Sequence, residues 1–252
     1  MALAFDFADR VVLVTGGTKG IGRVIAERFA DAGASAVVCG RNEPEQLDRA
    51  SFVACDVRDP DQVDAMVDHI VTEHGRLDVV VNNAGGSPSA DSATASPRFS
   101  EAIIKLNLLG PMFVAQAANR VMQSQADGGS IVNIASISGL RPTPNTAAYG
   151  AAKAGLLNLT QTLAMEWAPK VRVNAVTAGL IQTELAHLFY GDADALQRVA
   201  ATIPVGRMGA PDDIASACLF LASPAASFVT GANLVVHGGG ERPPYIEAVS
   251  GS

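Results

Sequence analysis

Short runs of β-branched and apolar residues alternate with longer amphipathic segments along almost the whole chain. This alternation is typical of an α/β protein, in which right-handed crossover helices join successive parallel strands. Most of the short runs are apolar at nearly every position, as strands covered on both faces must be. We therefore predict a doubly wound α/β fold with a seven-stranded parallel sheet and helices on both faces. The predicted strands are 10–15, 36–40, 51–56, 79–83, 130–135, 171–176 and 233–236, and the predicted helices are 20–32, 60–74, 99–123, 146–167 and 211–221, with irregular helix over 183–201.

One crossover in this pattern is too short for a normal helix. Only nine residues, among them Pro44, separate Arg41 from Ser51. A βαβ crossover normally needs at least ~10–12 residues. We therefore predict little more than a turn there, with an open edge beside the second strand.

Length and composition decide between one domain and two. At 252 residues and 48% hydrophobic content, the chain can bury one large core. Because no linker or repeat divides it, we predict one domain over 1–252, with a tail at 241–252. The net charge of −7 argues against a nucleic-acid partner, which needs a basic face. The first residues do not form a secretory signal, and no apolar stretch reaches the roughly 18 residues of a membrane span.

The cysteines and histidines indicate neither a disulfide framework nor a metal site. Cys39, Cys55 and Cys218 are odd in number, widely spaced and set in apolar runs. The four histidines include no pair with metal-ligand spacing. We therefore expect a cytoplasmic protein that needs no metal and has no membrane partner.

A glycine-rich turn, Thr-Gly-Gly-Thr-Lys-Gly-Ile-Gly at 15–22, follows the first predicted strand and opens directly into a helix. Glycines let the backbone approach a pyrophosphate, and the helix N-terminus supplies free N–H groups with a partial positive charge. Glycine also punctuates ordinary loops. The strand before the turn and the helix after it favour a dinucleotide site in a Rossmann-type domain.

The end of the second strand distinguishes the two nicotinamide nucleotides. NAD sites place an acid about 20 residues after the turn, where it binds the ribose 2′-OH. Gly40 stands at that place, Arg41 follows it, and Lys19 lies in the glycine turn. Because a guanidinium suits a 2′-phosphate, we predict NADP(H) rather than NAD(H). The alternative is that both cations are solvated surface residues, and the neighbouring Glu43 weighs in its favour.

Two further strand ends fall at the carboxyl edge, where open α/β sheets bind ligands. After the third strand, Asp56 is placed to bond an adenine amino group and Val57 to form an apolar wall. After the fourth comes Asn-Asn-Ala-Gly at 82–85. Asn82 has a second interpretation, as a residue that stabilises a turn.

Tyr149 and Lys153 are four residues apart in a predicted helix, so both side chains project from one face. A nearby cation favours the phenolate and lowers a tyrosine pKa, which lets the phenol exchange a proton with a substrate oxygen. Ser136, at the end of the fifth predicted strand, is placed to bond the same oxygen. Ser138 is a second candidate for that role. A strand-end serine such as Ser136 also has a second interpretation, as a residue that only caps a loop.

The segment around Asn107 carries a break in helical hydrogen bonding. Pro111 has no N–H to give to the carbonyl of Asn107, four residues before it. A free carbonyl in a kinked helix invites an ordered water. We therefore predict a proton link from Lys153 to solvent at Asn107; the alternative is a mere kink beneath the sheet.

Together these motifs resemble those of the classical short-chain dehydrogenases/reductases, over roughly 7–240. The shared residues are Thr-Gly-x-x-x-Gly-Ile-Gly at 15–22, Asn-Asn-Ala-Gly at 82–85, the serine at 136 and Tyr-x-x-x-Lys at 149–153. The combination is far more specific than any one motif. The resemblance implies the same fold and a nicotinamide-dependent oxidoreductase.

The resemblance also implies roles for single residues. Tyr149 is expected to be the general acid/base, Ser136 to orient the carbonyl, and Lys153 to hold the nicotinamide ribose and lower the tyrosine pKa. Asn107 is expected in the proton relay. The family's Pro-Gly-x-Ile-x-Thr reads Ala-Gly-Leu-Ile-Gln-Thr at 178–183. The expected cofactor contacts are Gly16, Thr18, Lys19, Gly20, Ile21, Gly22, Arg41, Asp56, Val57, Asn83, Ala84, Gly85, Tyr149, Lys153, Gly179, Ile181 and Thr183.

We thus predict hydride transfer between NADP(H) and a ketone or secondary alcohol. Three loops are expected to shape the substrate pocket, 87–96, 140–146 and 185–194. Their large residues suggest an apolar ketone, and they are Leu140, Leu185, Leu188, Phe189 and Tyr190. A 3-oxoacyl-thioester reductase is the alternative substrate assignment, and a non-catalytic NADP sensor is the alternative class. Helices 99–123 and 146–167 are apolar on more than one face, which predicts a homotetramer or dimer.

Overall fold

Seven parallel strands form one sheet in the computed structural model, which describes residues 5–184, 186, 190–243, 245 and 249. Their order in space is β3-β2-β1-β4-β5-β6-β7, so the chain starts in the middle and winds outward in both directions. The predicted doubly wound sheet is therefore confirmed. The strands are β1 (Val11–Thr15), β2 (Ser35–Gly40), β3 (Ser51–Ala54), β4 (Val79–Asn82), β5 (Gly129–Ser136), β6 (Val171–Ala178) and β7 (Asn233–Val236).

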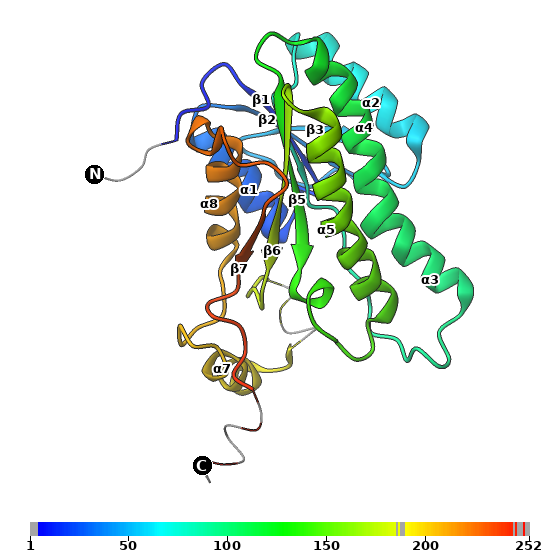
Figure 1. Cartoon of the computed structure of the whole chain (residues 1–252), viewed down its shortest axis with the longest axis vertical. Helices are drawn as coiled ribbons and strands as arrows, with labels where there is room; N and C mark the ends of the chain where they lie inside the picture. Colours follow the sequence, from blue (N-terminus) through cyan, green and yellow to red (C-terminus); the bar gives the residue numbers. More distant parts are fainter. Residues whose placement is uncertain (1–4, 185, 187–189, 244, 246–248, 250–252) are drawn as a thin grey trace.

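Helices cover both faces of the sheet (Figure 1). On one face lie α1 (Gly20–Asp31) and α8 (Pro211–Ala222); on the other lie α2 (Pro60–His74), α4 (Gly110–Ser124) and α5 (Ala147–Trp167). Each layer encloses its own cluster of buried apolar side chains. None of the helices in the described part of the chain combines the length and apolarity needed to cross a membrane.

Helix α2 shows how local sequence sets these boundaries. The Asp59 side chain accepts hydrogen bonds from the N–H groups of the first turn, and Pro60 follows at a position where a missing N–H costs nothing. Gly75 ends the helix in the left-handed conformation, at φ 75°. Between the two ends, Val63, Met66, Val67 and Ile70 face the sheet at helical spacing.

Two departures from the expected elements concern the helices. The predicted helix 99–123 is three pieces: α3 (Pro97–Ile104), a π-helical turn (Lys105–Leu109) and α4. In the segment 183–201, α7 (Ala193–Ala201) is the helix whose bounds lie within the described residues. The short crossover at 41–50 contains no helix, as predicted, and β3 lies at the edge of the sheet.

The register of the sheet brings the carboxyl ends of its strands to one edge, the lower edge in Figure 1. Thr15 at the end of β1 lies beside Cys39 of β2, and Asn82 at the end of β4 lies beside Asn133 of β5. Segments that are far apart in the sequence therefore meet at this edge. Most of the predicted site residues belong to them.

Candidate active site

The hydroxyl groups of Ser136 and Tyr149 lie close together at the end of β5, near enough for Ser136 to lower the pKa of Tyr149. Ser136 is the last residue of β5, and Tyr149 lies in the first turn of α5. Ser138 instead lies in the 3-10 turn that follows β5, where its backbone N–H donates to the Ser136 hydroxyl at 3.2 Å. Of the two candidate serines, the structure thus pairs Ser136 with the tyrosine.

Lys153 lies one helical turn after Tyr149 and is buried. Its ammonium donates to the carbonyl of Ile134 at 2.7 Å and lies 5.7 Å from the centroid of the Tyr149 ring. Burial lowers the pKa of Lys153 to about 8. The predicted juxtaposition of the two side chains is present, because residues four apart share one face of the helix.

The pKa of Tyr149 corrects one expectation. Burial raises it above its usual value, and the hydrogen bond from Ser136 lowers it by less. The net lowering expected from Lys153 is therefore wrong for this structure, since removing the phenolate from water outweighs the favourable interactions. A phenol with a raised pKa retains its proton at neutral pH.

Asn107 is fully buried and holds the chain between β4 and α3. Its amide oxygen accepts from the N–H of Gly86 at 2.8 Å, and its amide nitrogen donates to the carbonyls of Gly86 and Ile103, each at 2.9 Å. A Cβ on Gly85 would lie 2.7 Å from this amide oxygen and 3.3 Å from the Lys153 ammonium. Only glycine lets the backbone pass between Asn107 and Lys153.

The expected break in the helix at Asn107 is present as the π-helical turn (Lys105–Leu109). Turns of this kind often mark functional sites. Pro111 lies in the first turn of the next helix, α4, where its missing N–H is tolerated. The proton link through a water at Asn107 stays a prediction.

A buried polar network joins the sheet to both neighbouring helices. Asn82 donates to the carbonyl of Pro111 at 3.1 Å and to the side chain of Asn133 at 2.9 Å. Asn133 donates in turn to the Thr160 hydroxyl at 2.9 Å. The Asn82 side chain therefore ties β4 to α4 and β5, and these bonds do not reach the turn that it was predicted to stabilise. The signal for Asn133 was available in the sequence, as one polar residue inside a buried strand.

The glycine turn packs tightly on the end of β4. Gly16 has φ 63°, and a Cβ on it would lie 2.9 Å from the Cα of Ala84. The side-chain amide of Asn83 donates to the carbonyls of Thr15 and Gly16, at 2.9 and 3.2 Å. Asn83, predicted as a cofactor contact, thus uses its side chain to support the turn.

The N-terminus of α1 is in contact with an acidic side chain from the loop after β6. The backbone N–H of Gly20 donates to the carboxylate of Glu184 at 2.8 Å. The methyl group of Thr183 lies close to the same glycine, since a Cβ there would be 4.0 Å from it. The loop after β6 therefore lies over the glycine turn, and the donors there fit the phosphates of a dinucleotide. Glu184 was not predicted, because only the tertiary fold brings it to α1.

The predicted 2′-phosphate residues lie at neighbouring strand ends. Gly16 donates its N–H to the carbonyl of Cys39 at 2.9 Å, which places the glycine turn next to Gly40. Lys19 and Arg41, one on each segment, are both exposed. Exposed cations agree both with the 2′-phosphate interpretation and with the alternative of solvated surface residues.

The proposed adenine contacts are engaged within the protein. Arg58 binds both carboxylate oxygens of Asp56, and this pairing, helped by Arg41, holds the pKa of Asp56 below its usual value. Val57 is buried, and a Cβ on Gly110 would lie 3.1 Å from its side chain. A contact of either residue with adenine stays a prediction. Arg58 was missed, although a basic residue two positions after Asp56 was visible.

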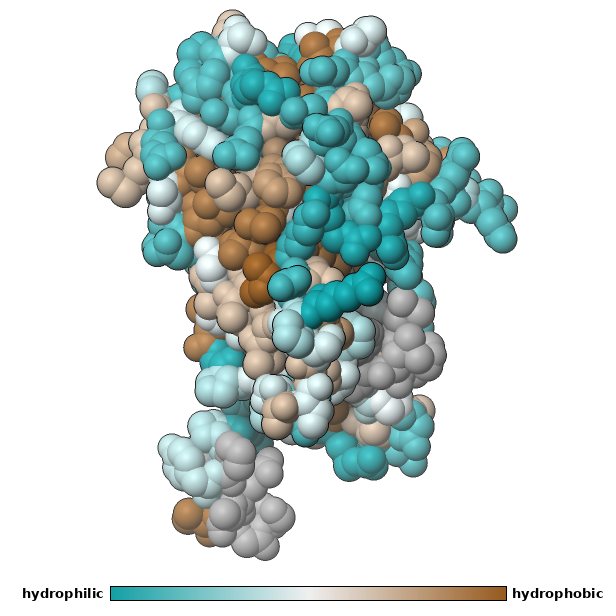
Figure 2. Space-filling model, turned by 90° about the vertical axis from the view of Figure 1, so that its right-hand side faces the viewer, coloured by the Kyte–Doolittle hydropathy of each residue, from teal (hydrophilic) through white to brown (hydrophobic). Residues whose placement is uncertain are grey.

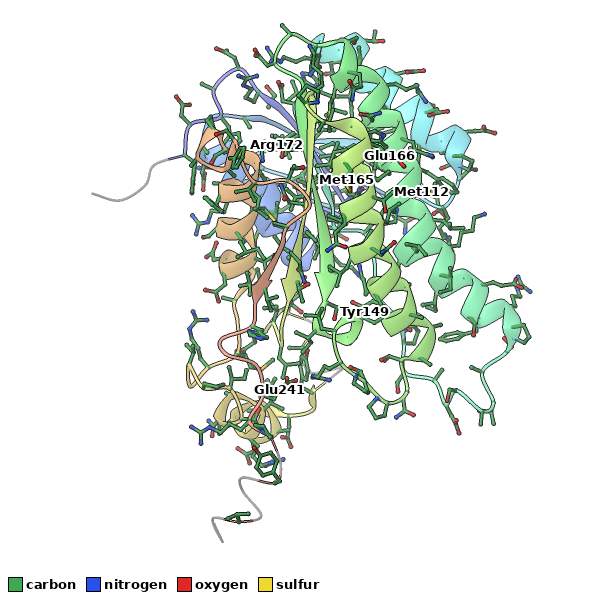
Figure 3. The ribbon with its side chains drawn as sticks, in the orientation of Figure 1. Met112, Tyr149, Met165, Glu166, Arg172 and Glu241 are labelled. Atoms are coloured by element: carbon green, nitrogen blue, oxygen red, sulfur yellow. The ribbon has the colours of Figure 1, made fainter. Side chains whose placement is uncertain are left out.

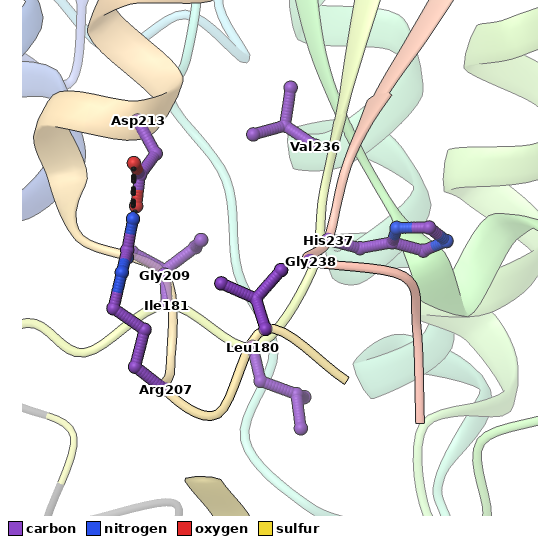
Figure 4. A pocket seen from close by; sticks show the side chains of 9 residues that line it. Leu180, Ile181, Arg207, Gly209, Asp213, Val236, His237 and Gly238 are labelled. Carbon is purple, nitrogen blue, oxygen red and sulfur yellow. Dashed lines mark hydrogen bonds and ion pairs between the residues drawn. The ribbon is translucent and has the colours of Figure 1, made fainter. Parts of the chain in front are cut away.

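A cavity of about 130 Å³ lies beside the loop after β6 (Figure 4). Its lining residues include Ile181, the ion pair of Arg207 with Asp213, and Gly238. None of the four predicted catalytic residues lines it. Leu185, Leu188 and Phe189, expected in the substrate pocket, lie outside the described residues, and Leu140 is 52% exposed.

Comparisons with known proteins agree with this geometry. A family model described as enoyl-(acyl carrier protein) reductase matches residues 16–241. Cis-4-hydroxycyclohexanecarboxylate dehydrogenase of Sinomonas cyclohexanicum is 40% identical, over 92% of this chain and 97% of its own. The 3-oxoacyl-(acyl-carrier-protein) reductase FabG of Chlamydia muridarum is 38% identical, also over 92% and 97%.

A solved structure extends the similarity to three dimensions. The aldohexose dehydrogenase of Thermoplasma acidophilum has a TM-score of 0.89 and 38% identity to this chain, over 93% of this chain and 95% of its own. Similarity of this extent in sequence and structure defines a family. The chain therefore belongs to the short-chain dehydrogenases/reductases, oxidoreductases that act on alcohols and ketones with a nicotinamide cofactor.

Proposed function

We propose that residues 1–252 form one catalytic domain that transfers hydride between NADP(H) and a ketone or secondary alcohol, with Tyr149 as the general acid/base. The observation that carries this proposal is the arrangement of Ser136, Tyr149 and Lys153 at the carboxyl end of β5. A sensor that only binds the cofactor does not need this acid/base set. Substrate-dependent change in NADPH absorbance tests the proposal, and its absence with every alcohol and ketone would contradict it.

The roles of the side chains follow from their contacts. When bound, the nicotinamide ring supplies or accepts the hydride. Tyr149 gives its proton to the substrate oxygen in reduction and removes it in oxidation, while Ser136 bonds the same oxygen and stabilises its negative charge. The raised pKa of Tyr149 keeps that proton available at neutral pH. Lys153, with a pKa of about 8, is mostly protonated at pH 7, and its charge favours the phenolate in the oxidation direction.

Several segments are proposed to hold the cofactor. The glycine turn and the N-terminus of α1 bind the pyrophosphate. Lys153 binds the nicotinamide ribose, and Gly179, Ile181 and Thr183 lie beside the carboxamide. Because the Ile181 side chain is buried, its backbone is the part proposed to contact the carboxamide. Asn107 links Lys153 to solvent for proton exchange.

We propose that Arg41 and Lys19 select NADP(H). Arg41→Asp removes a donor to the 2′-phosphate and adds a repulsive charge, so NADPH affinity should fall by about 10–100-fold while NADH affinity is kept or improved. Fluorescence titration of both cofactors measures this. Arg98→Asp, the same charge change at an exposed position on α3, is the control. Equal affinity of the unmodified protein for NADPH and NADH would contradict the preference.

A 3-oxoacyl-thioester reductase is the second candidate function. The 38% identity to the Chlamydia muridarum reductase favours it. Turnover of a 3-oxoacyl thioester at a far higher kcat/KM than that of simple ketones would select this candidate.

We also propose that the chain is a homo-oligomer, a dimer or tetramer, and that it is cytoplasmic. Figure 2 shows an apolar area on the side of the molecule that carries α3, α4 and α5. Met165 on α5 is 85% exposed, and Figure 3 shows Met165 and Met112 of α4 on the same side of the sheet. Apolar surface of this kind marks association sites. The three buried free thiols suit a reducing compartment.

The oligomer is tested by sedimentation velocity at micromolar protein concentration. We expect a dimer or tetramer for the unmodified chain and a shift towards monomer for Met165→Glu, because a buried unpaired charge is costly at an interface. Glu166→Gln, at the exposed neighbouring position, is the control. A monomer at all concentrations would contradict the proposal.

A further inference from the structure

The chain after β7 is held in a defined conformation as far as Arg242, the second residue of the tail predicted over 241–252. Gly238, Gly239 and Gly240 have φ values of 63°, 97° and 80°, which L side chains rarely adopt. The carbonyl of Gly238 accepts from the N–H of Val205 at 3.2 Å, and the N–H of Arg242 donates to the carbonyl of Thr202 at 3.0 Å. Backbone bonds before and after Glu241 therefore fix its position.

Glu241 forms a two-point ion pair with Arg141, one hundred residues earlier. Nε of Arg141 donates to one carboxylate oxygen of Glu241 at 3.3 Å, and Nη2 donates to the other. The remaining guanidinium nitrogen donates to the carbonyl of Pro142 and the hydroxyl of Thr143, each at 3.0 Å. All three nitrogens of the guanidinium are thus oriented by the protein.

The pair lies beside the proposed reacting groups. The N–H of Arg141 donates to the carbonyl of Ile137 at 3.0 Å, and Ile137 directly follows Ser136. Glu241 and Ile137 line one recess together with Leu180, from the loop after β6. Figure 3 shows Tyr149 and Glu241 at the same end of the sheet.

Tyr190 reports on the same neighbourhood. Burial is the largest cause of its raised pKa. The charges of Tyr149 and Glu241 raise this pKa further, while Arg141 lowers it. The Tyr149 phenol, the Tyr190 phenol and the ion pair therefore lie within electrostatic range of one another.

We infer that Arg141 and Glu241 select a neutral, hydroxyl-rich substrate, a polyol or an aldose, for the oxidoreductase proposed above, on which this inference rests. Their side chains are 40% and 27% exposed and offer fixed donors and acceptors with no net charge. Hydroxyl groups both donate to a carboxylate and accept from a guanidinium. An apolar ketone would desolvate the pair without replacing its hydrogen bonds to water, and a pair with no net charge offers an anionic substrate no net attraction. This substrate class differs from the apolar ketone predicted from the sequence.

The experiment measures kcat and KM for a four-carbon polyol, an aldohexose, cyclohexanol and a 3-hydroxyacyl thioester with NADP⁺. We expect the unmodified protein to prefer the polyol or aldohexose over cyclohexanol by at least about tenfold in kcat/KM. Glu241→Ala and Arg141→Ala should each raise KM for the preferred substrate about tenfold, with little change for cyclohexanol.

Arg242→Ala is the matched control, because this exposed arginine follows Glu241 directly and its side chain is not assigned to the site. Its kinetics should match those of the unmodified protein. Affinity for NADPH, measured by fluorescence, should be the same in every variant, which separates loss of selection from loss of fold.

Two outcomes overturn the inference. If cyclohexanol or the thioester is the better substrate, or if both alanine variants lose activity equally on all substrates, the pair does not select hydroxyl groups and the proposed oxidoreductase function stands. If no alcohol reacts and no ketone is reduced, although NADPH binds, the proposed function is wrong, and the inference falls with it.

Discussion

Replacing Tyr149 by phenylalanine should lower kcat by about 10²–10⁴-fold, the range that a positioned acid or base contributes. The change removes only the hydroxyl that lies near Ser136 and keeps the ring beside Lys153. Affinity for NADPH should change little, because the proposed cofactor contacts at the glycine turn and Lys153 remain. Steady-state kinetics with the best substrate and fluorescence titration of NADPH measure the two quantities.

The two serines provide a matched control for this assignment. Ser136→Ala removes the hydroxyl that lies near Tyr149 and is proposed to bond the substrate oxygen, so kcat should fall in this variant too. Ser138→Ala, two residues later, should keep kcat near that of the unmodified protein, because only its backbone N–H is engaged with Ser136. Near-normal turnover in Tyr149→Phe, or a larger loss in Ser138→Ala than in Ser136→Ala, would refute the assignment.

The second large effect concerns stability and arises at Asp78, far from the reacting groups in sequence. Asp78 is 5% exposed and accepts from Arg10 at 3.0 Å, from Arg76 at 2.5 and 2.8 Å, and from the N–H of Val11 at 2.9 Å. Asp78→Ala removes the buried acceptor of the Val11 N–H and of both arginines, whose own side chains are 39% and 34% exposed and keep Asp127 as a partner. The free energy of unfolding should fall by about 1–3 kcal/mol, as measured by urea denaturation at fixed protein concentration.

Asp127 is the matched control, because it pairs with the same two arginines but is 61% exposed. Asp127→Ala should lower the free energy of unfolding by only about 0–1 kcal/mol, since water screens an exposed pair. Equal losses of unfolding free energy in Asp78→Ala and Asp127→Ala would show that burial does not strengthen the contribution of Asp78 to stability.

The pH dependence follows from the shifted pKa of Asp78. Burial raises this pKa, but the bonds from Arg76, Val11 and Arg10 outweigh burial and hold it below its usual value. A carboxyl whose pKa is lower in the folded state contributes stability above its unfolded pKa and loses it as the pH falls through the folded value. The stability difference between the unmodified protein and Asp78→Ala should therefore narrow below about pH 4.

Features that depend on neighbours in the sequence were predictable. The alternation of apolar runs and amphipathic segments indicated the sheet, and a crossover of nine residues excluded a helix between β2 and β3. The spacing of Tyr149 and Lys153 placed them on one face of α5, because helical geometry relates residues four apart. The carboxyl ends of parallel strands meet at one edge of the sheet, so Ser136 was expected near both Tyr149 and Lys153.

The extent of each element was less predictable, because packing adjusts the ends. β6 continues to Ala178 and β5 to Ser136, beyond the predicted ends, since neighbouring strands extend each other's hydrogen bonding. The helix predicted over 99–123 is divided by the π-helical turn, where Asn107 bonds Gly86 across the space between two segments.

The sequence by itself determined the fold class, the glycine-rich turn after β1 and the spacing that brings Ser136, Tyr149 and Lys153 together, because each depends on local spacing or on the periodicity of apolar residues. Only the tertiary structure decided that burial raises the Tyr149 pKa, that Glu184 reaches the N-terminus of α1, and that Glu241 pairs with Arg141. The desolvation of Tyr149 depends on every atom that excludes water from it. The contacts of Glu184 with α1 and of Glu241 with Arg141 join residues 164 and 100 positions apart. No spacing in the sequence encodes such distances; the winding of the sheet creates them.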